Sequence, residues 1–310
     1  MISLLLAAAA AASFTTAEVR AGAGDALAGT LLTPTGRTRA AMVVIPGSGP
    51  TDRDGNNPAG IKAGSYRKLA EALAERGVAT VRIDKRGMFG SVAAGNPNTA
   101  TFADYDRDVR AWVEVARKAS GQKCVWVAGH SEGGLVAMRA GNAPNVCGVV
   151  LLAAPGEKLG DTIRKQLRAN PANAPILASA ETALAELESG RRVSVEGMHP
   201  ALAQRLFNPA VQGFMIELLR QEPTKLAAAV RRPMLIVQGG HDVQVGLANG
   251  DVLKTAAPTA SYALFPAMSH LLADAPAERT ANLATYGDAE RPLTEGLADR
   301  VAAFVTAGKR

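Results

Sequence analysis

Gly129, Ser131 and Gly133 form a G-x-S-x-G pattern, which is typical of a nucleophilic serine. An apolar run ends at Ala128 and a helix-like stretch begins at Glu132, so the pattern lies at an expected strand-to-helix turn. Side chains at the two glycine positions would collide with so tight a turn. The turn lifts the Ser131 hydroxyl above the sheet edge at a helix N-terminus, where the partial positive charge stabilises an oxyanion. The structural alternative is a glycine-rich turn with a capping serine.

A serine nucleophile needs a base, and the chain contains four histidines. We predict His270 as the base because it lies in a short loop after an expected strand at 260–265. The alternative for this residue is an ordinary surface histidine. His130 lies inside the turn, where its side chain is expected to point away from the serine hydroxyl. His199 lies in a helical region, and His241 directly precedes the candidate acid.

The candidate acid is Asp242, which follows the expected strand 233–238. Its loop leaves the same carboxyl edge of a parallel sheet as the loop of His270, so we expect the two side chains to meet there. Glu157, which follows the strand ending at Leu152, is the alternative acid. In that case Asp242 would only cap a turn.

Backbone N–H groups are expected to stabilise the negative charge on the substrate oxygen. One donor is the N–H of Glu132, at the start of the helix after Ser131. The other is expected in the loop 46–50, which is glycine-rich and lets the backbone approach the substrate closely. We predict the N–H of Ser48, with that of Gly49 as the alternative. The structural alternative for the loop is an ordinary tight turn.

Short apolar runs alternate with amphipathic stretches along most of the chain. This alternation predicts an α/β fold, with a mostly parallel central sheet flanked by helices. A hairpin-like pattern comes first, beginning at Val19 and containing an expected strand at 26–32. Further strands are expected at 40–45, 78–83, 124–128, 146–152, 233–238 and 260–265, and helices at 66–76, 102–118, 132–140 and 293–305.

Residues 156–230 break this pattern, because helical stretches alternate with prolines and no buried strand is evident. We predict a helical lid at 156–230, inserted between core segments at 18–155 and 231–310. The expected lid helices cover 161–169, 176–188 and 209–220. Four apolar residues at helical spacing either line a pocket for an acyl chain or form plain core, namely Phe207, Phe214, Met215 and Leu218.

Residues 1–17 are predicted to be a signal peptide. The apolar run 2–12 is too short for a membrane span of about 20 residues but suits the hydrophobic region of a secretory signal. Small residues between Ala12 and Ala17 offer cleavage points. The expected location is therefore the periplasm or the cell exterior. The alternative is a misassigned start codon, which would leave the protein in the cytoplasm.

The chain has two cysteines, Cys124 and Cys147, which open strands that we expect to be neighbours. Their Cα atoms can therefore lie within disulfide distance. An oxidising periplasm favours the bond, and the alternative is a pair of buried thiols. Two cysteines are too few for a disulfide scaffold or a cysteine-rich metal cluster.

The composition excludes several other classes of protein. Hydrophobic residues make up 47% and charged residues 20%, which excludes a disordered chain. The net charge is +6, but the basic residues are scattered and aromatic residues are only 4%, so we expect no nucleic-acid partner. The histidines lack zinc-site spacing, and no G-x-G-x-x-G opens a helix after a strand. We therefore expect no metal, no dinucleotide cofactor and no stable membrane span.

Four segments together resemble the α/β-hydrolase superfamily, in its esterase and serine-aminopeptidase-like branch. They are GSGPTDRDGN at 47–56, RIDKRG at 82–87, GHSEGG at 129–134 and PMLIVQGGHDVQV at 233–245. The likeness runs from about Leu27 to the C-terminus. The chain order Ser131, Asp242, His270 matches the triad positions of that family. The resemblance implies hydrolysis of carboxylic esters.

Met88 and Phe89 depart from the family pattern, which has smaller residues at these positions. A bulky Phe89 near the cleft is expected to narrow the acyl pocket. Asp52, Arg53 and Asp54 match a polar segment of the family. For these three residues a salt-bridged brace and a catalytic role both remain open.

The candidate residues together predict a serine hydrolase that cleaves carboxylic esters with short to medium acyl chains through an acyl-enzyme. A serine peptidase or amidase of the same fold is the first alternative, because a triad by itself does not separate C–O from C–N cleavage. The second is a non-catalytic ligand-binding protein on a hydrolase fold. The expected partner is a small-molecule ester, and the oligomeric state is left open.

Overall fold

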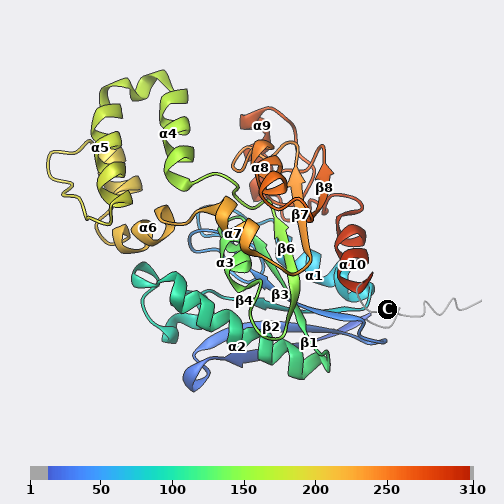
Figure 1. Cartoon of the computed structure of the whole chain (residues 1–310). Coiled ribbons are helices and arrows are strands. Elements are labelled where there is room, and N and C mark those ends of the chain that lie inside the picture. The colour runs from blue at the N-terminus through green and yellow to red at the C-terminus, as the bar shows by residue number, and fades with distance from the viewer. Residues whose placement is uncertain (1–12, 308–310) are drawn as a thin grey trace, which may run out of the picture.

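The computed structural model describes residues 13–307, apart from the side chain of Arg205. Its centre is an eight-stranded sheet in the order β1-β2-β4-β3-β5-β6-β7-β8 (Figure 1). β2 runs antiparallel to both of its neighbours, whereas the other pairs are parallel, which confirms the predicted α/β fold. The strands are β1 (Phe14–Ala21), β2 (Leu27–Pro34), β3 (Ala40–Ile45), β4 (Val78–Ile83), β5 (Val125–His130), β6 (Val146–Leu152), β7 (Met234–Gly239) and β8 (Ser261–Phe265).

The inner strands are apolar on both faces because helices cover both faces of the sheet. Every residue of β3, β4 and β7 is buried. Parallel strands joined by crossover helices bring their carboxyl ends, and the loops that follow them, to one edge. One face packs against α1 (Ser65–Glu75) and α10 (Leu297–Ala307), and the other against α2 (Phe102–Ser120), α3 (Glu132–Ala140) and α8 (Ala248–Ala256).

Between β6 and β7 the chain forms only helices and irregular segments. α4 and α5 extend away from the sheet (Figure 1). The lid has a small core of its own, which includes Leu184 and Phe207. Ion pairs from Arg164 to Glu181 and Glu188, at 2.9 and 2.7 Å, hold α4 against α5. The lid helices are α4 (Leu159–Ala169), α5 (Leu177–Glu188), α6 (Gln212–Leu219) and α7 (Pro223–Ala229).

The sheet begins earlier in the chain than the sequence pattern predicted. β1 starts at Phe14, and residues 14–17 pair with residues 31–34 of β2. The core therefore starts before position 18, and part of the predicted signal peptide belongs to the sheet. The reason is that Thr15 and Thr16, interpreted as small residues near a cleavage site, are β-branched and favour a strand. Residues 1–12 of that prediction lie outside the described residues.

Three short α-helices within residues 13–307 have no counterpart among the predicted helices: α7, α8 and α9 (Arg279–Ala284). The longest of them has nine residues, which is too few for apolar periodicity to stand out. Among residues 13–307, no helix combines the length and the apolar character that crossing a membrane requires.

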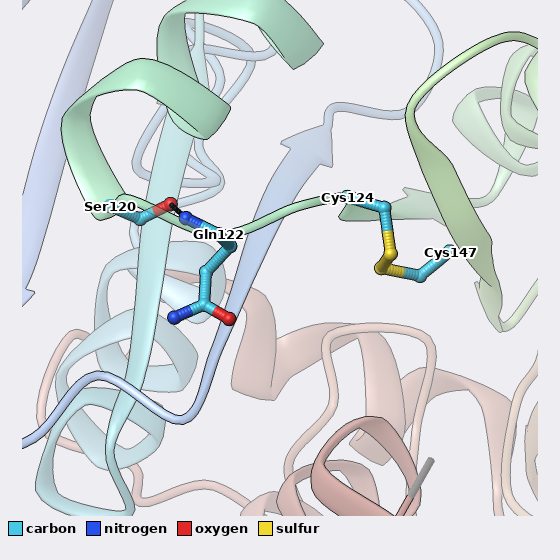
Figure 2. The surroundings of a disulfide bond; sticks show 4 residues. All are labelled: Ser120, Gln122, Cys124 and Cys147. Atoms are coloured by element: carbon cyan, nitrogen blue, oxygen red, sulfur yellow. Dashed lines mark hydrogen bonds between the residues drawn. A yellow bond between two sulfur atoms is a disulfide. The ribbon is translucent and has the colours of Figure 1, made fainter. Parts of the chain in front are cut away.

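A disulfide bond joins Cys124, the residue before β5, to Cys147 in β6 (Figure 2). The two Cα atoms are 5.2 Å apart because β5 and β6 are neighbours, paired from Val125 and Val146 onward. The sequence left open a disulfide bond or a pair of buried thiols, and the structure contains the disulfide bond. It ties the amino ends of the two strands, whereas Ser131 follows the other end of β5.

Replacing both cysteines by serine is expected to lower the free energy of unfolding by about 3 kcal/mol, because the cross-linked positions are 23 residues apart. Guanidinium-induced unfolding of Cys124→Ser/Cys147→Ser and of the oxidised wild type measures the difference. Reduced wild type is the control and should resemble the double variant. Two reactive thiols in denatured, non-reduced wild type would contradict the bond.

Candidate active site

Ser131 lies in the sharp turn between β5 and α3, which we call the elbow (residues 129–133). Its backbone has φ 52° and ψ −125°, a conformation that costs a non-glycine residue about 1–3 kcal/mol. A Cβ atom on Gly129 would collide with the carbonyl group of Gly133. A Cβ atom on Gly133 would lie 2.5 Å from the carbonyl oxygen of Ile45. The turn therefore requires both glycines.

The ring of His270 is hydrogen bonded to the carboxylate of Asp242, with Nδ1 2.8 Å from Oδ2. The other carboxylate oxygen accepts the N–H groups of Gln244 and Val245, each at 2.8 Å. Both side chains of the pair are buried, that of Asp242 completely. Because a carboxylate only accepts, Nδ1 of His270 carries the proton, and Nε2 keeps a lone pair that can take a proton from a nucleophile.

Two cavities meet at Ser131. The smaller, of about 170 Å³, is also lined by His270 and by polar side chains such as Asn57 and Thr51. The larger, of about 330 Å³, lies between the sheet edge and the lid. Its wall combines polar and apolar side chains, and the apolar ones include Leu135, Leu159, Ile163, Leu218, Pro223 and Val243. The structure thus brings Ser131 and His270 to one cavity, while Asp242 holds His270 from behind.

The backbone N–H groups of Ser48 and Glu132 are free to bind a substrate oxygen, since neither donates a hydrogen bond within residues 13–307. Ser48 lines both cavities and Glu132 lines the larger one, whereas the alternative donor Gly49 lines neither. Gly47 brings this loop against the elbow, since a Cβ atom there would lie 3.1 Å from the Cβ of Ser131. The two predicted donors therefore lie beside the serine.

Residues 59–276 match the family described as serine aminopeptidase, S33. The chain belongs to this family. The S33 family is a branch of the α/β-hydrolases, so the match confirms the resemblance that the four sequence segments indicated.

The chain is 26% identical over 207 residues to esterase EstD of Thermotoga maritima, which is therefore a relative. The matching region is 66% of this chain and 47% of EstD, so the chain spans about half the length of that relative. Pyrococcus furiosus esterase Pf2001 has a similar structure, with a TM-score of 0.54, 15% identity, and coverage of 95% of this chain and 93% of that one. Proline iminopeptidase of Mycobacterium smegmatis is also similar, with a TM-score of 0.56 and 18% identity. The match covers 94% of this chain and 98% of the iminopeptidase. At such identities the two structures establish the shared fold.

Among the described residues, the alternative acid Glu157 pairs with Lys165, at 2.6 Å, rather than with His270. It lines the larger cavity of the S33 fold. The carboxylate that meets the base is therefore that of Asp242.

The other histidines considered from the sequence have different partners or surroundings. Nδ1 of His241 donates to a backbone carbonyl at 2.7 Å, and His199 is exposed in the lid.

The four apolar lid residues divide between the two interpretations left open. Leu218 lines the larger cavity. Phe207 and Met215 pack into the core of the lid, and Phe214 packs on the main core, where its ring is stacked on that of Phe102. Of the four, only Leu218 lines one of the two cavities at Ser131 in the described part of the chain.

Phe89 narrows neither of the two cavities at Ser131, contrary to the expectation from the sequence. The residue is 42% exposed and lines neither cavity. The chain turns at this residue, with φ 44°. The N–H of Gly90 then donates to Asp84 at 3.0 Å, which holds the segment to the loop after β4 and leaves the ring at the surface.

The polar segment at Asp52, Arg53 and Asp54 forms a brace. Arg53 is paired with Asp84 at 2.7 Å, and Asp54 is paired with Arg82. Asp52 accepts the N–H of Asp54 at 2.9 Å. None of the three lines either cavity, so the structure favours the bracing interpretation over the catalytic one.

The sequence interpretation missed two sets of contacts around the elbow. The Tyr66 hydroxyl lies 2.7 Å from Nδ1 of His130, and Nε2 of His130 lies 2.8 Å from the carbonyl oxygen of His270. Lys85 and Glu132 form a buried ion pair at 3.2 Å. No spacing rule links residues so far apart in the chain, and only the folded sheet edge brings them together.

Burial, followed by the charge of His270, lowers the pKa of His130 from an ordinary value of 6.5 to about 3. The folded protein therefore keeps this ring neutral, whereas the unfolded chain binds a proton below pH 6.5. The stability that His130 contributes is complete above the unfolded pKa and is lost as pH falls toward the folded one. Between pH 7.5 and pH 5 the expected loss is about 2 kcal/mol.

Urea unfolding at the two pH values measures this loss in the wild type. His130→Gln should lack the His130 contribution. His199→Gln, which removes an exposed histidine of the lid, is the matched control and should keep it. An equal loss of stability in His130→Gln and in the wild type would contradict the prediction.

Proposed function

We propose that this S33 family protein hydrolyses carboxylic esters, with Ser131, His270 and Asp242 as its catalytic triad. The observation that carries the proposal is the buried hydrogen bond between His270 and Asp242, beside the cavity that His270 shares with Ser131. The relative EstD is an esterase, and so is Pf2001, which has the same fold. Both names support an ester as the substrate.

The proposed reaction has two halves. Nε2 of His270 takes the proton of Ser131 as its oxygen bonds to the ester carbonyl carbon, and Asp242 keeps the imidazole in the required tautomer. The N–H groups of Ser48 and Glu132 stabilise the oxyanion. When the C–O bond to the alcohol breaks, His270 returns the proton to the departing alcohol. Water then attacks the acyl-enzyme by the same steps, which releases the acid and restores the serine.

The cavities favour one placement of the ester. The leaving alcohol receives its proton from His270, and this residue lines the smaller cavity but not the larger one. We therefore place the alcohol part in the smaller cavity and the acyl part in the larger one. Apolar side chains such as Leu135, Ile163 and Leu218 suit a short to medium acyl chain there.

We also propose that the protein is exported. The apolar run 2–12 has the length of a secretory signal, and the disulfide bond suits an oxidising compartment. Cleavage near Ala12 would keep the whole of β1, whereas cleavage after Ala17 would remove its first half. Pairing in β1 therefore favours the start of the predicted cleavage interval.

Ser131→Ala should lower the rate of p-nitrophenyl butyrate hydrolysis by about 10⁴-fold or more, because the variant lacks the nucleophile. Release of p-nitrophenol by wild type and variant measures the effect. Labelling by a fluorophosphonate tests the nucleophile independently of any ester, and the variant should not be labelled.

Two outcomes would redirect the proposal. A wild type that is labelled but cleaves no ester would keep the nucleophile and overturn the ester substrate. Aminoacyl p-nitroanilides would then test the amide alternative, which the S33 family name and the iminopeptidase of the same fold support. A folded wild type that is not labelled would overturn catalysis and leave a ligand-binding role.

Leu218→Trp should lower kcat/KM for p-nitrophenyl octanoate relative to acetate by about tenfold, because the larger side chain fills the cavity assigned to the acyl chain. The matched variant Ile61→Trp narrows the smaller cavity instead. It should change the preference among alcohol parts of butyrate esters and leave the acyl-chain profile unchanged. The opposite pair of effects would place the acyl chain in the smaller cavity.

A further inference from the structure

We propose that Tyr66 and His130 are positioning residues that link the loop of Ser48 to the loop of His270 through a directed chain of hydrogen bonds. The proposal rests on the function proposed above. The chain runs from the N–H of Gly47 to the Tyr66 hydroxyl, then through the ring of His130 to the carbonyl oxygen of His270. Its three separations are 3.1, 2.7 and 2.8 Å.

Every bond of the chain has a single direction. A carbonyl oxygen only accepts, so Nε2 of His130 carries the proton bonded to His270. In a neutral ring Nδ1 then holds the lone pair and accepts the hydroxyl proton of Tyr66. The oxygen of Tyr66 in turn accepts the N–H of Gly47. All the polar atoms of the chain are thereby satisfied.

The two side chains in the middle of the chain stay neutral. Both Tyr66 and His130 are buried, with 2% and 4% of their surface exposed. Burial raises the pKa of Tyr66 and lowers the pKa of His130 to about 3. The ring of His270, whose centroid is 4.6 Å from that of His130, further disfavours a charge there. The direction of the chain is therefore kept while His270 gains and loses its proton.

Each part of the chain adjoins a group that takes part in the proposed reaction. Gly47 precedes the oxyanion donor Ser48, and His130 precedes the nucleophile Ser131. The last acceptor is the backbone of the base itself. A shift of any one part would therefore change its distance to the others, and the chain opposes such a shift.

The first turn of α1 supports the loop of the base at a second point. The Ser65 hydroxyl donates to the carbonyl oxygen of Leu271 at 2.7 Å, while Tyr66 supports His270 through the intervening ring. Two successive residues of α1 thus hold the carbonyl groups of two successive residues in the loop of the base. The same loop contains Leu272 at φ 62°, a conformation that a leucine adopts only when its surroundings impose it.

Tyr66→Phe tests the proposal, because it removes the hydroxyl and keeps the buried ring. We expect kcat and the rate of fluorophosphonate labelling to fall about 10-fold to 100-fold, since a misplacement of about 1 Å has an effect of this size. KM should stay within about twofold of the wild type, because the ring that lines the smaller cavity is kept and the lost hydroxyl is bonded to Gly47 and His130. Tyr105→Phe is the matched control. It removes a buried tyrosine hydroxyl that lines neither cavity, and it should resemble the wild type.

Nuclear magnetic resonance of ¹⁵N-histidine tests the direction of the chain in the unaltered protein. At pH 7 the ring of His130 should be neutral, with its proton on Nε2. The Nδ1 proton of His270, which is bonded to Asp242, should shift or broaden in Tyr66→Phe and stay unchanged in Tyr105→Phe. A tyrosine with only a structural role would lower Tm without moving this resonance.

The proposal is overturned if Tyr66→Phe keeps the kcat and labelling rate of Tyr105→Phe. It is also overturned if His130 carries its proton on Nδ1, a result that does not depend on how the variants fold. A wild type that is not labelled overturns the proposed function instead. The His130 tautomer then still decides whether the directed chain exists.

Discussion

The sharp turn at Ser131 is the constraint on which the rest of the site depends. A serine at φ 52° keeps this conformation only because its surroundings impose it. Glycines at 129 and 133 leave the space, and β5 is held between β3 and β6 in the middle of the sheet. The place of the hydroxyl is therefore set by strand pairing. Any group that acts with it must come from the same sheet edge, as Ser48 does after β3, Asp242 after β7 and His270 after β8.

Buried charges around the elbow contribute to position more than to stability. The side chains of Lys85 and Glu132 are each 3% exposed and pair at 3.2 Å, and the second carboxylate oxygen has no hydrogen-bond partner within residues 13–307. Removing two charges from water offsets most of their attraction, so such a pair adds little net stability over apolar side chains. What the pair does provide is a link between the first residue of α3, whose N–H is a proposed oxyanion donor, and the loop after β4. The brace at Arg53 and Asp84 links that loop to the segment after β3 in the same way.

The parts of the site that could be predicted are those with a local signal. Ser131 and Asp242 each follow an apolar strand, and the alternation of strands and helices implies that such loops share one edge. Tyr66 has no such signal. In the sequence it is one more apolar position of an amphipathic helix, and its hydroxyl gains partners only when α1, the elbow and the loop after β8 meet. The expectation for Phe89 was wrong for the opposite reason. The residue follows a motif closely in the chain, which implied that it lies near the cleft, but the chain turns at φ 44° there and leaves the ring at the surface.

A substitution in the wall of the larger cavity and one in the wall of the smaller cavity have different effects on the loop of the base. The lid has its own core and its own ion pairs, so the lid side of the larger cavity can change shape without moving the sheet edge. The smaller cavity is lined by Ser65, Tyr66 and His130, which also hold the loop of the base. In the proposed enzyme, acyl preference can therefore vary almost independently of rate. Most changes in the alcohol side alter rate and preference together, because the same buried atoms serve both.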